Sequence, residues 1–171
     1  MSDTPHPMRR KERALPRAEA LALLNAATVA TLSMVTEDGP YAVPVSPVCI
    51  GETLYFHSAQ KGRKVEALKR DPRVWLSVFG EATSTNGDPA EMFSSACQRF
   101  SMYFSSAMAW GNLREVTDEA EKVAALRALC EKFTPAHMDG FAQAIAESLK
   151  ITAVYALSLE NVSGKAKKRR G

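Results

Sequence analysis

The sequence is poor in the residues that build disulfide frameworks and metal centres. Its 171 residues include three cysteines and three histidines, and no two cysteines form a CxxC pair. An odd number of thiols argues against a disulfide framework, and the scattered histidines argue against a zinc cluster. We therefore expect no metal site and three reduced thiols, Cys49, Cys97 and Cys130.

Long hydrophobic runs are also missing. No stretch approaches the roughly 18 consecutive apolar residues that a membrane-spanning helix needs. The opening segment, MSDTPHPMRRKER, lacks the apolar core of a signal peptide. Hydrophobic residues make up 46% and charged residues 24% of the chain, which is ordinary for a globular domain. We expect a single domain over 1–171, located in the cytoplasm and without a membrane partner.

Positive charge is not spread evenly, although the net charge is only +3. It gathers near both ends of the chain, and we interpret 1–13 and 165–171 as flexible basic tails in water. No aromatic residues interleave with these cations, and no recognition helix of a known type is evident. Nucleic acid is therefore the least favoured class of partner.

Hydrophobic periodicity and turn residues predict a β-rich chain with several helices. Helices are predicted over 17–27, 62–70, 117–133 and 138–149. Strands are predicted over 28–35, 41–50, 53–58, 73–80, 99–116 and 151–162. Residues 81–99 are small and polar, and we expect a long loop there. Short turns at Asp38-Gly39 and Gly51-Glu52 indicate antiparallel neighbours, and closure into a barrel would remove exposed strand edges.

One segment has the features of a phosphate site. The predicted strand over 53–58 leads through Gly62 into a helix that opens with Arg63 and Lys64. The first N–H groups of a helix are unpaired, and the helix dipole there favours an anion. Two cations at the same place would add charge-assisted hydrogen bonds. The alternative, a surface helix with exposed cations, stays open on this evidence.

Two further segments could contribute to a ligand site. Pro44 and Pro47 interrupt the strand over 41–50, which indicates an edge or bulged strand with free backbone groups. Such groups could bind a planar imide ring, or the segment is simply an irregular edge. Trp110 and the neighbouring aromatic residues could line a site or belong to the core. Because no Ser-His-Asp order, carboxylate pair or HExxH is evident, a bound cofactor would have to supply the chemistry.

Taken together, these segments resemble a known family. The motifs that carry the resemblance are MRRKER, YxVPVS, LYFHSAxxGRKxxxLxxDPRV, the strand around Trp110-Gly111, and SGKA over 163–166. In this order they resemble the pyridoxamine 5'-phosphate oxidase-like FMN-binding split barrels, most closely the nitroimidazole-resistance branch, across roughly residues 8–166. The resemblance implies a mainly β fold with helices (α+β), a six-stranded antiparallel split β-barrel of Greek-key type. It also implies a homodimer with FMN at the interface.

The resemblance further implies roles for particular residues. His57 matches a histidine proposed to be catalytic, and the partner subunit is expected to contribute around Tyr103, Ser105 and Trp110. Arg63 and Lys64 match the pair that grips the FMN phosphate, which agrees with the site deduced from the helix start. The residues expected along the flavin ring and ribityl chain are Val43, Pro44, Val45, Ser46, His57, Ser58 and Ala59.

The implied activity is that of an FMN-dependent oxidoreductase, with a nicotinamide donor and a small acceptor such as a nitroaromatic. The alternative is a non-enzymatic flavin- or haem-binding module, in which His57 would be an axial ligand. The sequence departs from its relatives at Phe104, where members of the branch often carry arginine. It also ends without the tryptophan- and arginine-containing segment of the pyridoxal-forming enzymes, so that specific activity is not expected.

Overall fold

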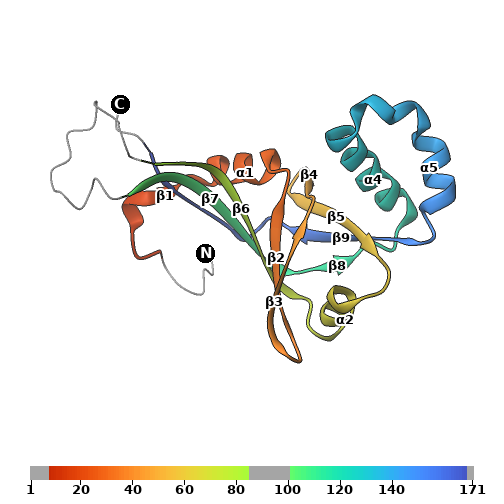
Figure 1. Cartoon of the computed structure of the whole chain (residues 1–171), viewed down its shortest axis with the longest axis horizontal. Coiled ribbons are helices and arrows are strands. Elements are labelled where there is room, and N and C mark those ends of the chain that lie inside the picture. Colours follow the sequence, from red (N-terminus) through yellow and green to blue (C-terminus); the bar gives the residue numbers. More distant parts are fainter. Residues whose placement is uncertain (1–7, 85–100, 169–171) are drawn as a thin grey trace.

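Two antiparallel sheets and four α-helices make up the described part of the chain. The computed structural model describes residues 8–84 and 101–168 (Figure 1). Ten strands are present in these ranges. The long sheet has the order β1-β10-β7-β6-β2-β3. Its strands are β1 (Ala14–Leu15), β2 (Ala30–Thr36), β3 (Gly39–Val45), β6 (Arg73–Ser84), β7 (Met102–Asn112) and β10 (Val162–Lys167).

The second sheet has the order β4-β5-β9-β8 and carries two of the helices on its outer side. Its strands are β4 (Val48–Ile50), β5 (Thr53–Ala59), β8 (Arg114–Glu115) and β9 (Thr152–Ser158). The helices are α1 (Arg17–Ala26), α2 (Arg63–Arg70), α4 (Glu119–Phe133) and α5 (Phe141–Ser148), with short 3-10 helices at Lys11–Arg13 and Pro135–Gly140. Asp118 begins α4 by accepting a hydrogen bond from the Glu121 N–H at 2.7 Å, as its sequence position suggests.

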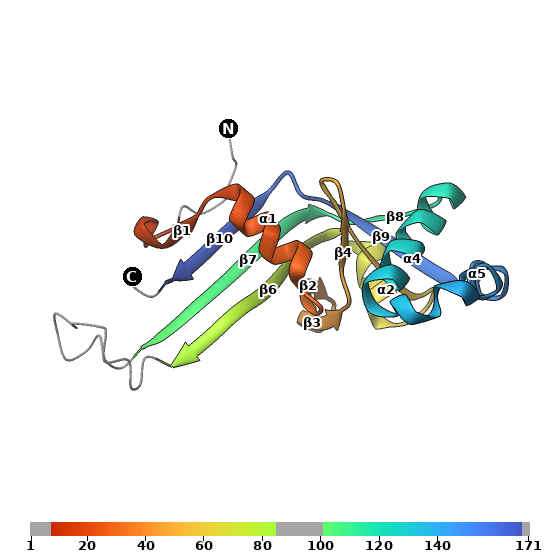
Figure 2. The same cartoon turned by 90° about the horizontal axis from the view of Figure 1, so that it is seen from above.

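The main core lies between the two sheets and α1. Leu24 of α1, Leu32 of β2 and Leu76 of β6 are fully buried there, together with Phe56 of β5. Alternation along β2 and β6 points these leucines to the same side of the long sheet, which α1 covers (Figure 2). A second cluster fills the space between the short sheet and α4 and α5; its members include Tyr55, Leu126, Phe141 and Val154.

The strand predicted over 41–50 is two strands. β3 ends at Val45 and β4 starts at Val48, with Pro47 buried between them. The predicted edge position of the proline-containing segment is confirmed, because β3 is the last strand of the long sheet. Proline has no N–H to donate, so Pro44 is tolerated at an edge, and Pro47 lies where the chain leaves the ladder.

The loop predicted over 81–99 was wrong for its first four residues. β6 extends to Ser84, because Ala82–Ser84 pair with β7 beyond a bulge between Phe79 and Ala82. The bulge lets polar residues follow an apolar strand without ending the pairing. The remainder of that prediction, 85–99, lies outside the described residues.

The strand predicted over 151–162 ends at Ser158, and a further strand, β10, follows it. The predicted tail from residue 165 was therefore wrong for 165–167, which pair with β7. In β10 the small residues Gly164 and Ala166 are buried, while Lys165 and Lys167 alternate with them and stay partly exposed. Such alternation is that of a half-buried strand and explains why a basic segment can be ordered. At the other end, Lys11–Arg13 likewise form a 3-10 helix rather than a flexible tail.

Candidate functional site

The predicted phosphate site lies in the short loop between the end of β5 and the start of α2. Gly62 is the N-cap of α2, with a φ of 118° that favours glycine, and it supplies no side-chain cap. The first N–H groups of α2 therefore depend on solvent or a ligand. Arg63 and Lys64 occupy the first two helical positions, so two cations and unpaired N–H groups lie at one place. The arrangement suits an anion.

Arg63 is held by the β2–β3 hairpin. Its guanidinium donates to Thr36 Oγ1 and to Asp38 Oδ2, each at 3.3 Å. It also stacks over the Tyr41 ring, with the guanidinium carbon 4.6 Å from the ring centroid. The side chain is 53% exposed, so the guanidinium is positioned and still accessible to a ligand.

Lys64 and His57 lie close to one another, next to Arg63. The Lys64 ammonium is 5.4 Å from the centroid of the Phe56 ring, and burial lowers the pKa of Lys64. His57 reaches the surface, but it is crowded enough that desolvation lowers the pKa of its imidazole below 6.5, and the charge of Lys64 lowers it further. The neutral imidazole is therefore favoured at pH 7.

The remaining residues predicted in this subunit line β3 and the end of β5. Pro44 and Ser46 are exposed, Val43 is half-buried and Val45 is buried. Because β3 is an edge strand, its backbone groups facing away from β2 have no strand partner in the described ranges. At the end of β5, next to His57, the half-buried Ser58 and the exposed Ala59 lead toward α2.

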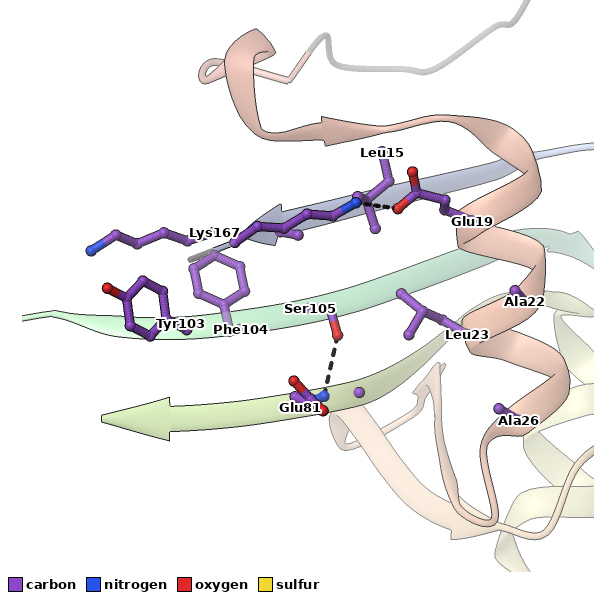
Figure 3. A pocket seen from close by; sticks show the side chains of 13 residues that line it. Leu15, Glu19, Ala22, Leu23, Ala26, Glu81, Tyr103, Phe104, Ser105 and Lys167 are labelled. Atoms are coloured by element: carbon purple, nitrogen blue, oxygen red, sulfur yellow. Dashed lines mark hydrogen bonds and ion pairs between the residues drawn. The ribbon is translucent and has the colours of Figure 1, made fainter. Parts of the chain in front are cut away.

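The other predicted residues lie elsewhere within one chain. Tyr103 and Ser105 belong to the start of β7, at the opposite end of the long sheet from α2 (Figures 1 and 2), where they line a cavity against α1 (Figure 3). Trp110 is 9% exposed and stacks on Trp75, with ring centroids 4.7 Å apart. A single chain therefore does not bring Tyr103 and Ser105 to Arg63, and the predicted role of all three residues across a dimer interface stays a prediction.

Sequence reasoning missed the residues that hold Arg63. Asp38 was interpreted only as part of a turn, Tyr41 was taken as a strand residue, and Thr36 lay between the two predicted strands. A signal was present in the hairpin itself, because a carboxylate beside a glycine turn is a natural partner for a nearby cation. What could not be foreseen was that α2 packs against this hairpin.

The described residues form neither a metal cluster nor a membrane-spanning helix. No group of three or more histidine, cysteine, aspartate or glutamate side chains that could hold a metal ion occurs within 8–84 and 101–168. Within the same ranges no helix is long and apolar enough to cross a membrane.

The two antiparallel sheets, their flanking helices and the cationic start of α2 define the class as an α+β protein with a candidate anion site. Comparison with protein families makes this specific: the pyridoxamine 5'-phosphate oxidase family profile matches residues 16–166, and the chain belongs to this family. The two sheets are consistent with the family's split-barrel fold, while a six-stranded barrel stays a prediction. No curated protein matches the chain.

Solved structures include several similar folds. The flavocytochrome Anf3 from Azotobacter vinelandii is 25% identical with a TM-score of 0.76, over 98% of this chain and 75% of that one. A FAD and haem binding protein from Mycobacterium smegmatis is 21% identical with a TM-score of 0.73, over 93% of this chain and 75% of that one. A candidate 5-nitroimidazole antibiotic resistance protein from Bacteroides thetaiotaomicron VPI-5482 is 20% identical with a TM-score of 0.67, over 91% and 90%.

Proposed function

We propose that the protein is an FMN-binding oxidoreductase of the cytoplasm, closest to the nitroimidazole-resistance branch of its family. It would pass electrons from a nicotinamide donor to a small acceptor such as a nitroaromatic. The observation that carries the proposal is the pair of cations at the uncapped start of α2, with Arg63 held by the β2–β3 hairpin. Family membership and similarity to a flavocytochrome support it.

The residues present fit the phosphate end of FMN. Arg63 and Lys64 would pair with a doubly charged phosphate, and the first N–H groups of α2 would donate to its oxygens. The edge strand β3 would offer backbone groups of Val43–Ser46 to the polar rim of the ring. Ser58 and Ala59 would lie along the chain between phosphate and ring. A bound flavin supplies the hydride and electron transfer that protein side chains cannot perform.

His57 has the protonation state suited to this site. A neutral imidazole at pH 7 can accept or donate one hydrogen bond without repelling Lys64. Next to a bound ring and an acceptor, the neutral imidazole could accept a proton as a general base or hold a hydrogen bond. We therefore assign His57 as the candidate catalytic residue.

We also propose that the protein is a homodimer. The face of the long sheet opposite α1 carries four apolar side chains with large exposed fractions: Val35 56%, Trp75 41%, Phe79 75% and Met108 43%. Side chains alternate along a strand, so Trp75, Ser77 and Phe79 share one face of β6. Ser77 pairs with Met108 of β7, which places Met108 on that face. Trp75 pairs with Ser33 of β2, which places Val35, two residues further along β2, on the same face. A second copy packed on this face would remove it from water and bring the partner's Trp110 into the interface, because the Trp110 ring stacks on Trp75.

The phosphate assignment is tested by FMN titration calorimetry. Replacing Arg63 and Lys64 by alanine should weaken binding by at least ten-fold, because each charged contact contributes about 1.5–3 kcal/mol. Lys69→Ala, an exposed cation near the other end of the same helix, is the control and should bind FMN like the unaltered protein. Unchanged affinity in the double variant would show that the phosphate, if bound, sits elsewhere.

A second candidate function is a non-enzymatic flavin- or haem-binding module. It is favoured by His57, whose neutral imidazole could coordinate iron, and by the flavocytochrome among the similar folds. The absorption spectrum of the purified protein separates the two: flavin gives two broad bands in the near-ultraviolet and blue, whereas haem gives one sharp, intense Soret band. A Soret band that His57→Ala abolishes would favour the module.

A further inference from the structure

Lys132, near the end of α4, donates to three backbone carbonyls. Its ammonium nitrogen lies 2.8 Å from the oxygen of Asn25, 2.7 Å from that of Ala27 and 2.9 Å from that of Pro47. An ammonium has three N–H donors, so these bonds use all of them. Among the ion pairs found within 8–84 and 101–168, none involves Lys132. Carbonyl oxygens, rather than a carboxylate, therefore face this charge.

This ammonium has given up part of its contact with water. Lys132 is half-buried, and desolvation lowers its pKa. Cys49 of β4 lies near it, but burial raises the pKa of the Cys49 thiol, which is therefore neutral at pH 7 and no counter-ion. A charged group is stable in such surroundings only when its donors are satisfied, so the ammonium depends on the three carbonyls.

The three carbonyls lie on both sides of the open end of the β2–β3 hairpin. Two of them are at the C-terminal end of α1, where a helix leaves its last carbonyls unpaired. From there the chain enters β2, whose first residue, Ala30, pairs with Val45, the last residue of β3. The third carbonyl is that of Pro47, two residues after Val45. Lys132 therefore holds both the chain that enters the hairpin and the chain that leaves it.

The segment that ends at this point, Val43–Ser46, is the one predicted to line the flavin ring. β3 is an edge strand whose ladder with β2 ends at Val45, and the end of an edge strand frays readily unless something fixes it. α1 and α4 both pack on β4, the strand that follows (Figures 1 and 2). Pro47 is buried and has no N–H, so its carbonyl is the one backbone group that it can offer to these helices. Lys132 supplies the donor.

We propose that Lys132 is a positioning residue for the flavin ring, because its ammonium fixes the backbone of Val43–Ser46 at the open end of the hairpin. The proposal rests on the proposed function, in which that backbone meets the polar rim of FMN. The closed end of the same hairpin holds Arg63 through Thr36 and Asp38. One hairpin thus joins the phosphate end of the site, fixed at Arg63, to the ring end, fixed at Lys132.

FMN titration and the midpoint potential of bound FMN test this role. Lys132→Met, which has a similar length and no donors, should weaken FMN binding by about five-fold, as expected for the loss of one or two hydrogen bonds to the ring. It should also lower the midpoint potential, because N–H groups directed at the ring stabilise its electron-rich reduced form more than its oxidised form. Lys132→Arg keeps several donors and should retain both values of the unaltered protein.

Lys122→Met is the matched control. Lys122 lies on the same helix and also donates to a backbone carbonyl, that of Leu149 at 2.8 Å, but this bond ties α4 to the end of α5. The substitution removes the same charge and should leave affinity and potential unchanged. Urea unfolding shows that each variant is folded in the titration buffer. Should Lys132→Met not fold, Lys132→Gln, with a shorter side chain and one amide group, replaces it with the same expected direction.

An unchanged midpoint potential in the folded Lys132 variant would overturn the proposal even if binding weakened, since a role in stability alone leaves the surroundings of the ring as they were. An equal effect of Lys122→Met would also overturn it, because the loss of charge or of α4 packing would then be the cause. The proposed function fails differently, by the absence of FMN binding in the unaltered protein. If that protein binds FMN and only the Lys132 result is negative, the proposed function stands.

Discussion

Arg63 would be shared between the β2–β3 hairpin, which holds it in this structure, and the phosphate proposed to bind beside it. Its guanidinium is paired with Asp38 and Thr36 and lies over Tyr41, so an arriving phosphate meets a cation that is already oriented. Orientation reduces the entropy lost on binding, but the Asp38 carboxylate competes for the same charge. Because the carboxylate is 82% exposed, water screens the pair and its contribution is small.

We predict that Asp38→Asn tightens FMN binding by roughly 1.4- to five-fold, the equivalent of an exposed ion pair of about 0.2–1 kcal/mol. The substitution removes a negative charge next to the phosphate and leaves an oxygen that can still accept from Arg63. Fluorescence titration of FMN measures the effect. Glu37→Gln is the matched control, since Glu37 pairs with Arg70 instead. Weaker binding in Asp38→Asn would show that the carboxylate is needed to place Arg63.

His57 should titrate below 6.5, because desolvation and Lys64 both disfavour its charged form. Lys64→Met should raise the pKa of His57, since one of those two causes is removed. Proton-detected NMR of the imidazole across pH 4–9 follows both proteins. A pKa at or above 6.5 in the unaltered protein would contradict the crowded environment described for this ring.

The same shift predicts how stability depends on pH. The unfolded chain binds a proton at His57 near pH 6.5 and the folded chain only at lower pH, so protons favour the unfolded state in that window. The contribution is constant above pH 6.5 and is lost as the pH falls below it. Urea unfolding at pH 7.5 and pH 5.5 should therefore show a smaller decrease in stability for His57→Gln than for the unaltered protein. An equal decrease would assign the pH dependence to other groups.

Among the elements, the β6 bulge determines the shape of the cavity wall. Gly80 lies so close to Ser105 and Leu23 that a methyl group has no room, and Ser105 Oγ also accepts a hydrogen bond from the Glu81 N–H at 3.2 Å. α1, the bulge and β7 are therefore fitted to one another. The length of β6 beyond the bulge depends on this fit.

We predict that Gly80→Ala lowers the free energy of unfolding by about 1–3 kcal/mol, the usual effect of overpacking. Gly140→Ala is the control, because no atom lies within 4 Å of its added methyl group and its backbone is helical. That change should be neutral or slightly stabilising. Chemical denaturation of both variants measures the difference, and equal stabilities would mean that Leu23 and Ser105 move aside easily.

Local patterns predicted most elements, and tertiary packing explains where they failed. α1, α2, α4 and β5 follow from periodicity, caps and breakers that act within a few residues. β10 was missed because Val162–Lys167 contains three polar residues and a glycine, and becomes a strand only when Gly164 packs on Ala20 and Leu15. The cations of the site were evident in the sequence, whereas their hairpin partners depend on how α2 packs.

At the scale of the whole molecule, α1 covers one face of the long sheet, and no helix of residues 8–84 and 101–168 covers the patch on the opposite face. The opposite face exposes Val35, Trp75, Phe79 and Met108, a contiguous apolar surface that proteins rarely leave in water without a purpose. The residues predicted to bind the flavin also lie in two separate places, with Arg63 near one end of the long sheet and Tyr103 at the other. A second copy would account for both features.

We predict that Phe79→Glu converts the dimer to a monomer, because a carboxylate would be buried without a partner at the interface. Size-exclusion chromatography with light scattering measures the mass, with Ile151→Glu as the control. Ile151 is 70% exposed but lies in the turn before β9, away from this face. A monomeric unaltered protein, or an unchanged dimer in Phe79→Glu, would exclude this face as the interface.

The most direct test of the central claim is a crystal structure of the protein grown with excess FMN. We predict phosphate density within hydrogen-bonding distance of Arg63, Lys64 and the first N–H groups of α2. Density for FMN at another place, or a vacant α2 start with both side chains directed into solvent, would contradict the account.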